Sequence, residues 1–162
     1  MVIALGANEG DASTQLKVAA EQLAQRFDDL RCSSWWRTPP VGCPPGSPDF
    51  INGVVVARRP ERSASSVLEE LQALEHRAGR RQAALRNAPR VLDLDLILFG
   101  NTCMRSPQLE LPHPRALQRR FVLEPLAELA AALIWPTNHR TVAECLAAAP
   151  PLAEMQRMET NT

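Results

Sequence analysis

One apolar segment with two built-in carboxylates constrains this fold more than any other part of the chain. Residues 90–100 read Arg-Val-Leu-Asp-Leu-Asp-Leu-Ile-Leu-Phe-Gly, a run of strand length. Because side chains two apart on a strand point the same way, Asp93 and Asp95 are predicted to share one face. That face would also carry Val91, Ile97 and Phe99, and the opposite face the four leucines at positions 92, 94, 96 and 98.

Two neighbouring carboxylates on an apolar strand lower stability unless cations neutralise them. Hard oxygen ligands of this kind suit Mg²⁺, which binds through one or two carboxylates and completes its shell with substrate phosphates. A solvated strand face that happens to carry two aspartates explains a bare Asp-x-Asp equally well. Asp93 and Asp95 alone therefore leave both interpretations open.

The charge of the whole chain is balanced, but its arginines gather around the carboxylate strand. The sequence has 18 basic and 18 acidic residues, so nothing global indicates a nucleic-acid or membrane partner. The arginines near the strand are Arg77, Arg80, Arg81, Arg86 and Arg90 before it, and Arg115, Arg119 and Arg120 after it. The planar fork of arginine suits phosphate oxygens, although arginines on a helix face are usually just solvated.

The cysteines and the apolar segments indicate a cytoplasmic protein. The four cysteines are scattered, without a Cys-x-x-Cys pair, which disfavours structural zinc and favours reduced thiols. There is no signal-peptide pattern and no apolar run long enough to cross a membrane. We therefore expect a cytoplasmic location and no membrane partner.

The hydrophobic pattern predicts the order strand, helix, strand, strand, helix, strand. The predicted strands cover residues 2–5, 30–36, 50–57 and 90–100. The first helix is expected to begin after Asp11 or Ser13, and the second after Ser63 or Ser65, running to about Arg81. A stiff proline-rich loop, residues 38–48, separates the second and third strands.

Beyond residue 100, the sequence predicts an extended segment at 109–114, short helical pieces near 115–132 and 141–148, and a loose polar tail after about residue 155. The complete order is the split βαβ pattern of a ferredoxin-like α+β domain. We expect a βαββαβ antiparallel sheet with helices on one face and appended C-terminal helices. At 162 residues, the chain (1–162) is expected to form one domain.

Two further groups of residues indicate what this domain could bind. Glu75, Arg80, Arg90 and His113, together with the two aspartates, resemble a clamp for a metal and a triphosphate. A histidine between two prolines is, however, more often an ordinary surface residue. The second group suits a flat polar heterocycle: the rigid segment 38–42, Phe50 beside Asn52 on one strand face, and Phe121. Phe50 is equally well explained as ordinary core.

Several motifs in a fixed order resemble the family of 6-hydroxymethyl-7,8-dihydropterin pyrophosphokinases of folate biosynthesis. The resemblance runs from Ala4 to about Pro136. The matching segments are residues 5–8 (Leu-Gly-Ala-Asn), 37–42 (Arg-Thr-Pro-Pro-Val-Gly), 48–52 (Pro-Asp-Phe-Ile-Asn), Glu75 with 79–80, 89–95 (Pro-Arg-Val-Leu-Asp-Leu-Asp), 111–115 (Leu-Pro-His-Pro-Arg) and 119–123 (Arg-Arg-Phe-Val-Leu).

The resemblance implies transfer of pyrophosphate from ATP to the hydroxymethyl group of the pterin, with release of AMP. It implies that Asp93 and Asp95 hold two Mg²⁺ ions and act in catalysis with Arg80 and Arg90. The ATP-binding residues that it implies are Gln72, Glu75, Arg80, Arg90, Leu96, Leu109, His113 and Arg119. The pterin-binding residues that it implies are Thr38, Pro39, Val41, Phe50, Asn52, Asp93 and Phe121, with the ring stacked between the two phenylalanines. We expect a monomer that has no nucleic-acid partner.

Two other classes of function remain as alternatives. A metal-dependent phosphatase or nucleotidyltransferase could use the two aspartates differently. An aspartyl-phosphate phosphatase, however, needs a nucleophilic Asp after a parallel strand of a doubly wound sheet, which this element order does not supply. A non-catalytic RNA-binding module would need a basic, aromatic sheet surface, whereas this chain is neutral and has acids on its key strand.

Overall fold

A central antiparallel sheet organises the protein. The computed structural model describes residues 1–41, 43–79 and 90–159. Within these residues the strands of the sheet are β1 (Val2–Ala7), β2 (Arg31–Cys32), β3 (Trp36–Thr38), β4 (Phe50–Val56), β5 (Asp93–Leu98) and β8 (Gln156–Arg157). Their order is β5-β1-β4-β3-β8, with β2 also paired to β4. Every pairing between them is antiparallel, which confirms the expected α+β class with an antiparallel sheet.

The predicted strand at residues 30–36 is wrong as a continuous element, because it is divided into β2 and β3. Cys32 pairs with Val55 and Trp36 with Asn52. The chain therefore advances four residues between these pairs on the β2–β3 side but only three on β4. This extra residue is a bulge. The hydroxyl of Ser33 accepts a hydrogen bond from the N–H of Val54 across it.

The bulge also explains a glycine in the middle of β4. A Cβ at Gly53 would lie 2.5 Å from the ring of Trp35, far inside van der Waals contact. Only glycine lets the indole lie directly on the strand backbone.

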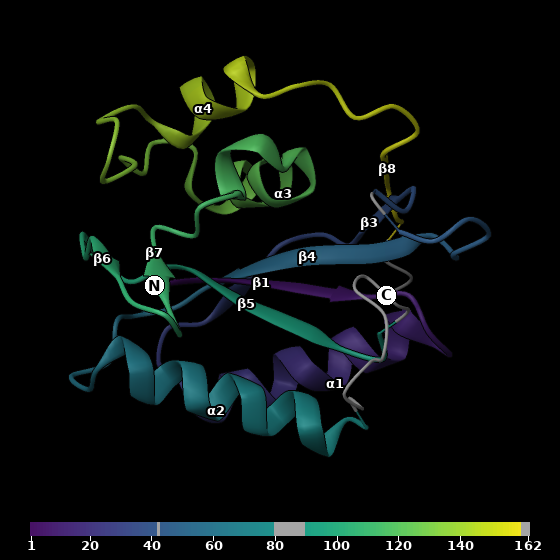
Figure 1. Ribbon diagram of the computed structural model, residues 1–162, viewed down its shortest axis with the longest axis horizontal. Helices are drawn as coiled ribbons and strands as arrows, with labels where there is room; N and C mark the ends of the chain where they lie inside the picture. Colours follow the sequence, from purple (N-terminus) through teal and green to yellow (C-terminus); the bar gives the residue numbers. More distant parts are fainter. Residues whose placement is uncertain (42, 80–89, 160–162) are drawn as a thin grey trace.

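Helices α1 (Ala12–Ala24) and α2 (Ala64–Arg77) cover one face of the sheet (Figure 1). The side chain of Asp11 caps α1 and that of Ser63 caps α2, which decides between the predicted alternatives. The second helix ends at Arg77, earlier than the predicted end near Arg81, which lies outside the described residues. Buried leucines of both helices form the first hydrophobic core with one face of the sheet.

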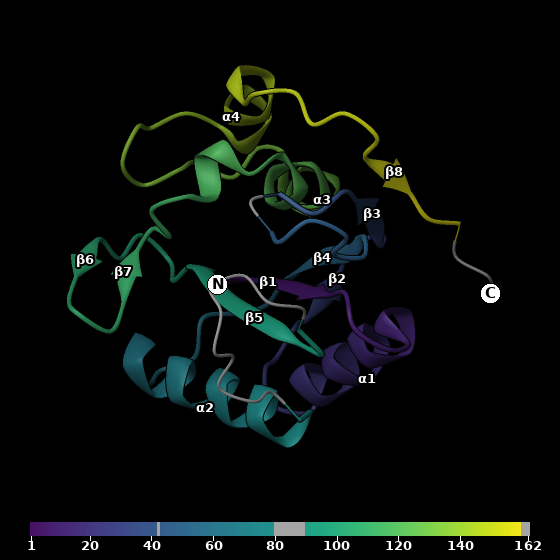
Figure 2. The ribbon, with the colours of Figure 1, turned by 45° about the vertical axis from the view of Figure 1, so that its right-hand side comes forward.

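The opposite face is covered by the C-terminal elements (Figures 1 and 2). A 3₁₀ turn (Ala116–Gln118) leads into α3 (Arg120–Ala130), and α4 (Val142–Ala148) packs on α3. A small hairpin of β6 (Met104–Arg105) and β7 (Glu110–Leu111) precedes them. The predicted helical pieces near 115–132 and 141–148 are thus confirmed. They enclose a second core that includes Trp135.

Strand β5 follows the predicted alternation of faces until its last residues. Leu92, Leu94 and Leu96 join the first core and Ile97 faces the second, as expected. Leu98 and Phe99 are on the faces opposite to those predicted, because Ile3 pairs with Leu96 while its neighbour Val2 pairs with Leu98. This register shift inserts one extra residue in β5 and exchanges the faces beyond it.

The polar C-terminal segment is more ordered than the sequence suggests. Gln156 and Arg157 form β8 on β3, and the N–H of Met158 donates to the carbonyl of Trp35 at 2.9 Å. The expectation of a loose tail after residue 155 is therefore wrong for these residues. Among the described helices, none is long and apolar enough to cross a membrane.

Candidate active site

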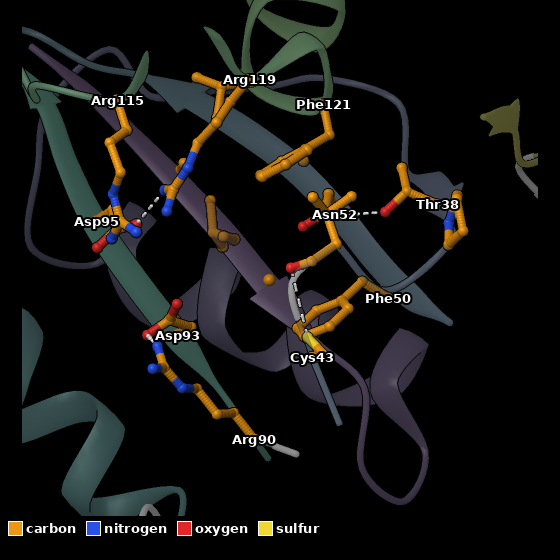
Figure 3. A pocket seen from close by; sticks show the side chains of 17 residues that line it. Thr38, Cys43, Phe50, Asn52, Arg90, Asp93, Asp95, Arg115, Arg119 and Phe121 are labelled. Carbon is orange, nitrogen blue, oxygen red and sulfur yellow. Dashed lines mark hydrogen bonds and ion pairs between the residues drawn. The ribbon is translucent and has the colours of Figure 1, made fainter. Parts of the chain in front are cut away.

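A pocket opens beside the start of α3, on the sheet face that carries the second core (Figure 3). Its floor comes from β1, β4 and β5, and its walls from the end of β3, the proline-rich loop, the segment before β5 and the first residues of α3. Asp93 and Asp95 both line it, as their predicted common face requires. The pocket thus joins segments that are far apart in the sequence.

All seven residues predicted to bind the pterin line this one pocket. They are Thr38, Pro39, Val41, Phe50, Asn52, Asp93 and Phe121. Two of the polar ones are tied together, because the Nδ2 of Asn52 donates to the Oγ1 of Thr38 at 2.8 Å and both side chains are buried. They present a rigid polar edge to the pocket.

Close approach of β1 keeps Asn52 in place. Gly6 pairs with Asn52 across the sheet, and a Cβ at Gly6 would lie 3.0 Å from the Oδ1 of Asn52. The backbone of β1 can therefore pass directly beneath the amide.

The two phenylalanines differ in how they are supported. Phe121 is half-buried and packs against the second core, whereas Phe50 belongs to neither core cluster. Figure 3 shows them on different sides of Asn52. The absence of Phe50 from the described cores favours its interpretation as a pocket wall over that of core filler.

Among the described residues, an arginine pairs with each carboxylate on β5. The Nη1 of Arg90 lies 2.7 Å from the Oδ1 of Asp93, and the Nη1 of Arg119 lies 3.2 Å from the Oδ2 of Asp95. The guanidinium of Arg119 also lies over the ring of Phe121, 5.6 Å from its centroid. Arg119 therefore connects the acidic and the aromatic parts of the pocket.

His113 stands next to Asp95 with its ring orientation fixed. Its backbone N–H donates to the carbonyl of Ile97, and its Nδ1 accepts from the N–H of Arg115 at 3.2 Å. Burial lowers the pKa of His113, and the nearby Arg119 and Arg115 lower it further, against the opposing effect of Asp95. The neutral ring then carries its proton on Nε2, 3.9 Å from the Oδ2 of Asp95.

The donor set at Asp93 and Asp95 fits a hard cation only together with a ligand. Both carboxylates are partly exposed to the pocket, with side-chain exposures of 23% and 36%. The described residues contain no group of three or more His, Cys, Asp or Glu side chains able to hold a metal. Two carboxylates completed by phosphate oxygens and water are the coordination that Mg²⁺ commonly adopts.

Several of the predicted ATP-binding residues lie outside this pocket. Gln72 is exposed on α2, and Leu96 and Leu109 are buried in the first core. Glu75 is 2% exposed, and its Oε1 accepts the N–H of Leu94 at 2.8 Å, between the two aspartates. Arg80 lies outside the described residues.

Asn8 links two segments that border the pocket, a role that the sequence did not indicate. It is buried directly after β1; its Oδ1 accepts the N–H of Arg90 at 2.8 Å and its Nδ2 donates to the carbonyl of Pro48 at 3.2 Å. It therefore joins the segment before β5 to the proline-rich loop. An asparagine in a glycine-rich turn after a strand was the signal that could have revealed it. Arg115 and Cys43 also line the pocket without having been predicted.

Comparison with known proteins agrees with this geometry. A family model described as 7,8-dihydro-6-hydroxymethylpterin-pyrophosphokinase (HPPK) matches residues 2–131. Three similar proteins carry the name 2-amino-4-hydroxy-6-hydroxymethyldihydropteridine pyrophosphokinase. The one from Pseudomonas aeruginosa is 38% identical over 151 residues, covering 91% of this chain and 90% of its own. Those from Synechocystis sp. and Haemophilus influenzae are 37% and 35% identical, covering 90% and 84% of this chain and 73% and 84% of their own. This chain belongs to the 7,8-dihydro-6-hydroxymethylpterin-pyrophosphokinase family.

Proposed function

We infer that this protein transfers the β,γ-pyrophosphoryl unit of ATP to the hydroxymethyl group of 6-hydroxymethyl-7,8-dihydropterin. The products are AMP and the pterin diphosphate, an intermediate of tetrahydrofolate biosynthesis. One observation supports this inference above others: in a chain of this family, a single pocket joins a rigid amide–aromatic wall to two carboxylate–arginine pairs.

The pterin occupies the wall made by Thr38, Asn52 and the two phenylalanines. The Asn52 amide, held by Thr38, offers hydrogen bonds to the edge of the heterocycle. Phe50 and Phe121 stack on its two faces, with Pro39 and Val41 closing the side of the proline-rich loop. This arrangement directs the hydroxymethyl group toward Asp93.

The triphosphate lies along β5, between Arg90 and Arg119. The hydroxyl oxygen attacks the β-phosphorus in line while the bond from this phosphorus to the α–β bridging oxygen breaks; that oxygen leaves with AMP, and the hydroxyl proton is released to water. Negative charge grows on the bridging oxygen and on the transferred group. Arg90 and Arg119 stabilise that charge once they leave the carboxylates for the phosphates. The neutral His113 donates its Nε2–H to a phosphate oxygen.

Asp93 and Asp95 would hold two Mg²⁺ ions. When bound, these ions neutralise phosphate charge and lower the pKa of the attacking hydroxyl. The chain's own residues contribute positioning and preorganised charge, with no dedicated general base. Arg80, together with Gln72, Glu75, Leu96 and Leu109, completes the proposed ATP site, with Arg80 acting in catalysis.

We also propose a ferredoxin-like topology, a single domain, a cytoplasmic location and a monomeric state. The strand order and the antiparallel pairings support the ferredoxin-like βαββαβ topology and a single domain over 1–162, because both cores share one sheet. Use of ATP supports a cytoplasmic location. A monomer without nucleic-acid or membrane partners is sufficient, since one chain supplies both walls of the pocket.

The decisive experiment measures the nucleotide product. Purified protein with ATP, Mg²⁺ and 6-hydroxymethyl-7,8-dihydropterin is expected to give AMP and pterin diphosphate in equal amounts. ADP as the product would contradict pyrophosphoryl transfer. Chelation by EDTA is expected to abolish turnover and added Mg²⁺ to restore it, so activity that survives chelation would contradict the metal requirement.

A further inference from the structure

We propose that Arg115 is a third phosphate-binding arginine of this site and makes the first contact with the triphosphate of the incoming nucleotide. This proposal rests on the proposed function and extends it to a residue with no role so far. Arg115 lines the pocket together with Arg90 and Arg119.

Arg115 differs from the other two arginines in its partners. Arg90 and Arg119 are each paired with an aspartate of β5. Within the described part of the chain, the Arg115 guanidinium has neither a hydrogen bond nor an ion pair with a carboxylate. Among the described residues that line the pocket there are three arginines and two aspartates, and the arginine without a carboxylate partner there is Arg115.

Two hydrogen bonds anchor the backbone beside Arg115 to β5 and to the ring of His113. The N–H of His113 donates to Ile97 of β5 at 3.0 Å, and the N–H of Arg115 donates to the His113 ring at 3.2 Å. Arg115 then opens the 3₁₀ turn before α3. Figure 3 shows its side chain extending from this anchored segment on the same side of the pocket as Arg119, toward Asp95.

An exposed arginine that lines the pocket and has no carboxylate partner among the described residues can bind phosphate before the paired arginines do. When Arg90 or Arg119 binds a phosphate, it gives up its ion pair with an aspartate. The net gain in binding free energy is therefore only part of that of the new interaction. The exposed Arg115 gives up only water when it binds a phosphate, and its positive charge attracts a polyphosphate from solution. It therefore contributes to binding in the ground state, so its loss raises the KM for ATP more than it lowers kcat.

The test is the binding of α,β-methylene-ATP with Mg²⁺, measured by titration calorimetry, since the methylene blocks cleavage of the α–β bond. Arg115→Gln is expected to weaken binding about tenfold or more, and Arg115→Lys to recover part of the loss because it keeps the charge. Arg115→Gln is also expected to flatten the salt dependence of the dissociation constant.

Arg105→Gln is the matched control, because it removes the same charge from an exposed residue of β6 outside the pocket. It is expected to bind within about twofold of wild type. Pterin binding and the thermal midpoint should be the same for wild type and Arg115→Gln.

Two failures are distinguishable. Wild-type protein that forms AMP, together with Arg115→Gln that binds the analogue as tightly as wild type, overturns the role of Arg115 alone. Wild-type protein that neither binds the analogue nor forms AMP overturns the proposed function, and the role of Arg115 with it.

Discussion

Asp95 contacts two other residues of the proposed phosphate site. Its Oδ2 lies 3.2 Å from Arg119 and 3.9 Å from His113, and it faces the pocket. The ion pair is partly exposed, so it contributes at most about 1 kcal/mol to stability. Its position is therefore better explained by function than by folding.

Replacing Asp95 by Asn is expected to separate activity from stability. The variant keeps the shape of the side chain but loses the charge that pairs with Arg119 and that we propose holds Mg²⁺, so kcat/KM should fall by at least about a hundredfold. The midpoint of thermal unfolding should stay within about 3 °C of wild type. Asp28→Asn is a suitable control, because that exposed carboxylate lies 3.8 Å from Arg58, outside the pocket lining. Turnover of Asp95→Asn within tenfold of wild type would argue against a metal role.

At the scale of elements, one buried side chain couples two segments that border the pocket. Asn8 accepts a hydrogen bond from the segment before β5 and donates one to the proline-rich loop at Pro48. Those segments carry Arg90 on one side, and Val41 and Cys43 on the other. The Arg90 side and the proline-rich side of the pocket are thus linked through Asn8, whose backbone N–H also donates to the carbonyl of Arg90 at 3.1 Å.

Asn8→Ala is expected to lower the free energy of unfolding by about 1–3 kcal/mol, because it leaves the Arg90 N–H and the Pro48 carbonyl without partners. The KM for both substrates should rise, because both walls of the pocket lose a hydrogen bond that positions them. Urea unfolding and steady-state kinetics measure the two effects, with the exposed Asn101→Ala as control. Asn8→Asp keeps the acceptor for Arg90 but not the donor to Pro48. If Asn8→Ala changed stability but neither KM, the coupling would be refuted.

At the scale of the whole molecule, the sequence predicted what depends on local pattern. The period of two along residues 90–97 was sufficient to identify the face of the two aspartates. The motifs were sufficient to select seven residues, proposed to bind the pterin, that the structure brings into one pocket. Residue types narrowed each helix cap to two candidates, of which the structure shows Asp11 and Ser63.

What the sequence missed depends on pairing across the sheet. The bulges at residues 33–35 and at Ile97 arise from register against β4 and β1, which no local period reveals. Strand β8 forms because β3 leaves an open edge, although its own residues are polar. Asn8 looked like a turn residue, because its partners lie about 40 and 82 positions away.

The two cores share one sheet, so we expect the molecule to unfold as one unit. Leu71 of α2 is fully buried in the first core and Leu126 of α3 in the second. Replacing either by Ala is expected to cost about 2–5 kcal/mol and to lower the single calorimetric midpoint by several degrees. Leu133→Ala, at an exposed leucine, should change stability by less than about 0.5 kcal/mol.

Whether the molecule unfolds as one unit can be tested by comparing the calorimetric and van't Hoff enthalpies of unfolding. In each variant the calorimetric and van't Hoff enthalpies should agree, because strands β1 and β4 contribute to both cores and cannot unfold with only one of them. If Leu126→Ala instead produced a second transition at lower temperature, while the first core still melted at the wild-type midpoint, α3 and α4 would form a separate unit. In that case the start of α3, and with it the Phe121 wall of the pocket, would be able to open without unfolding the sheet.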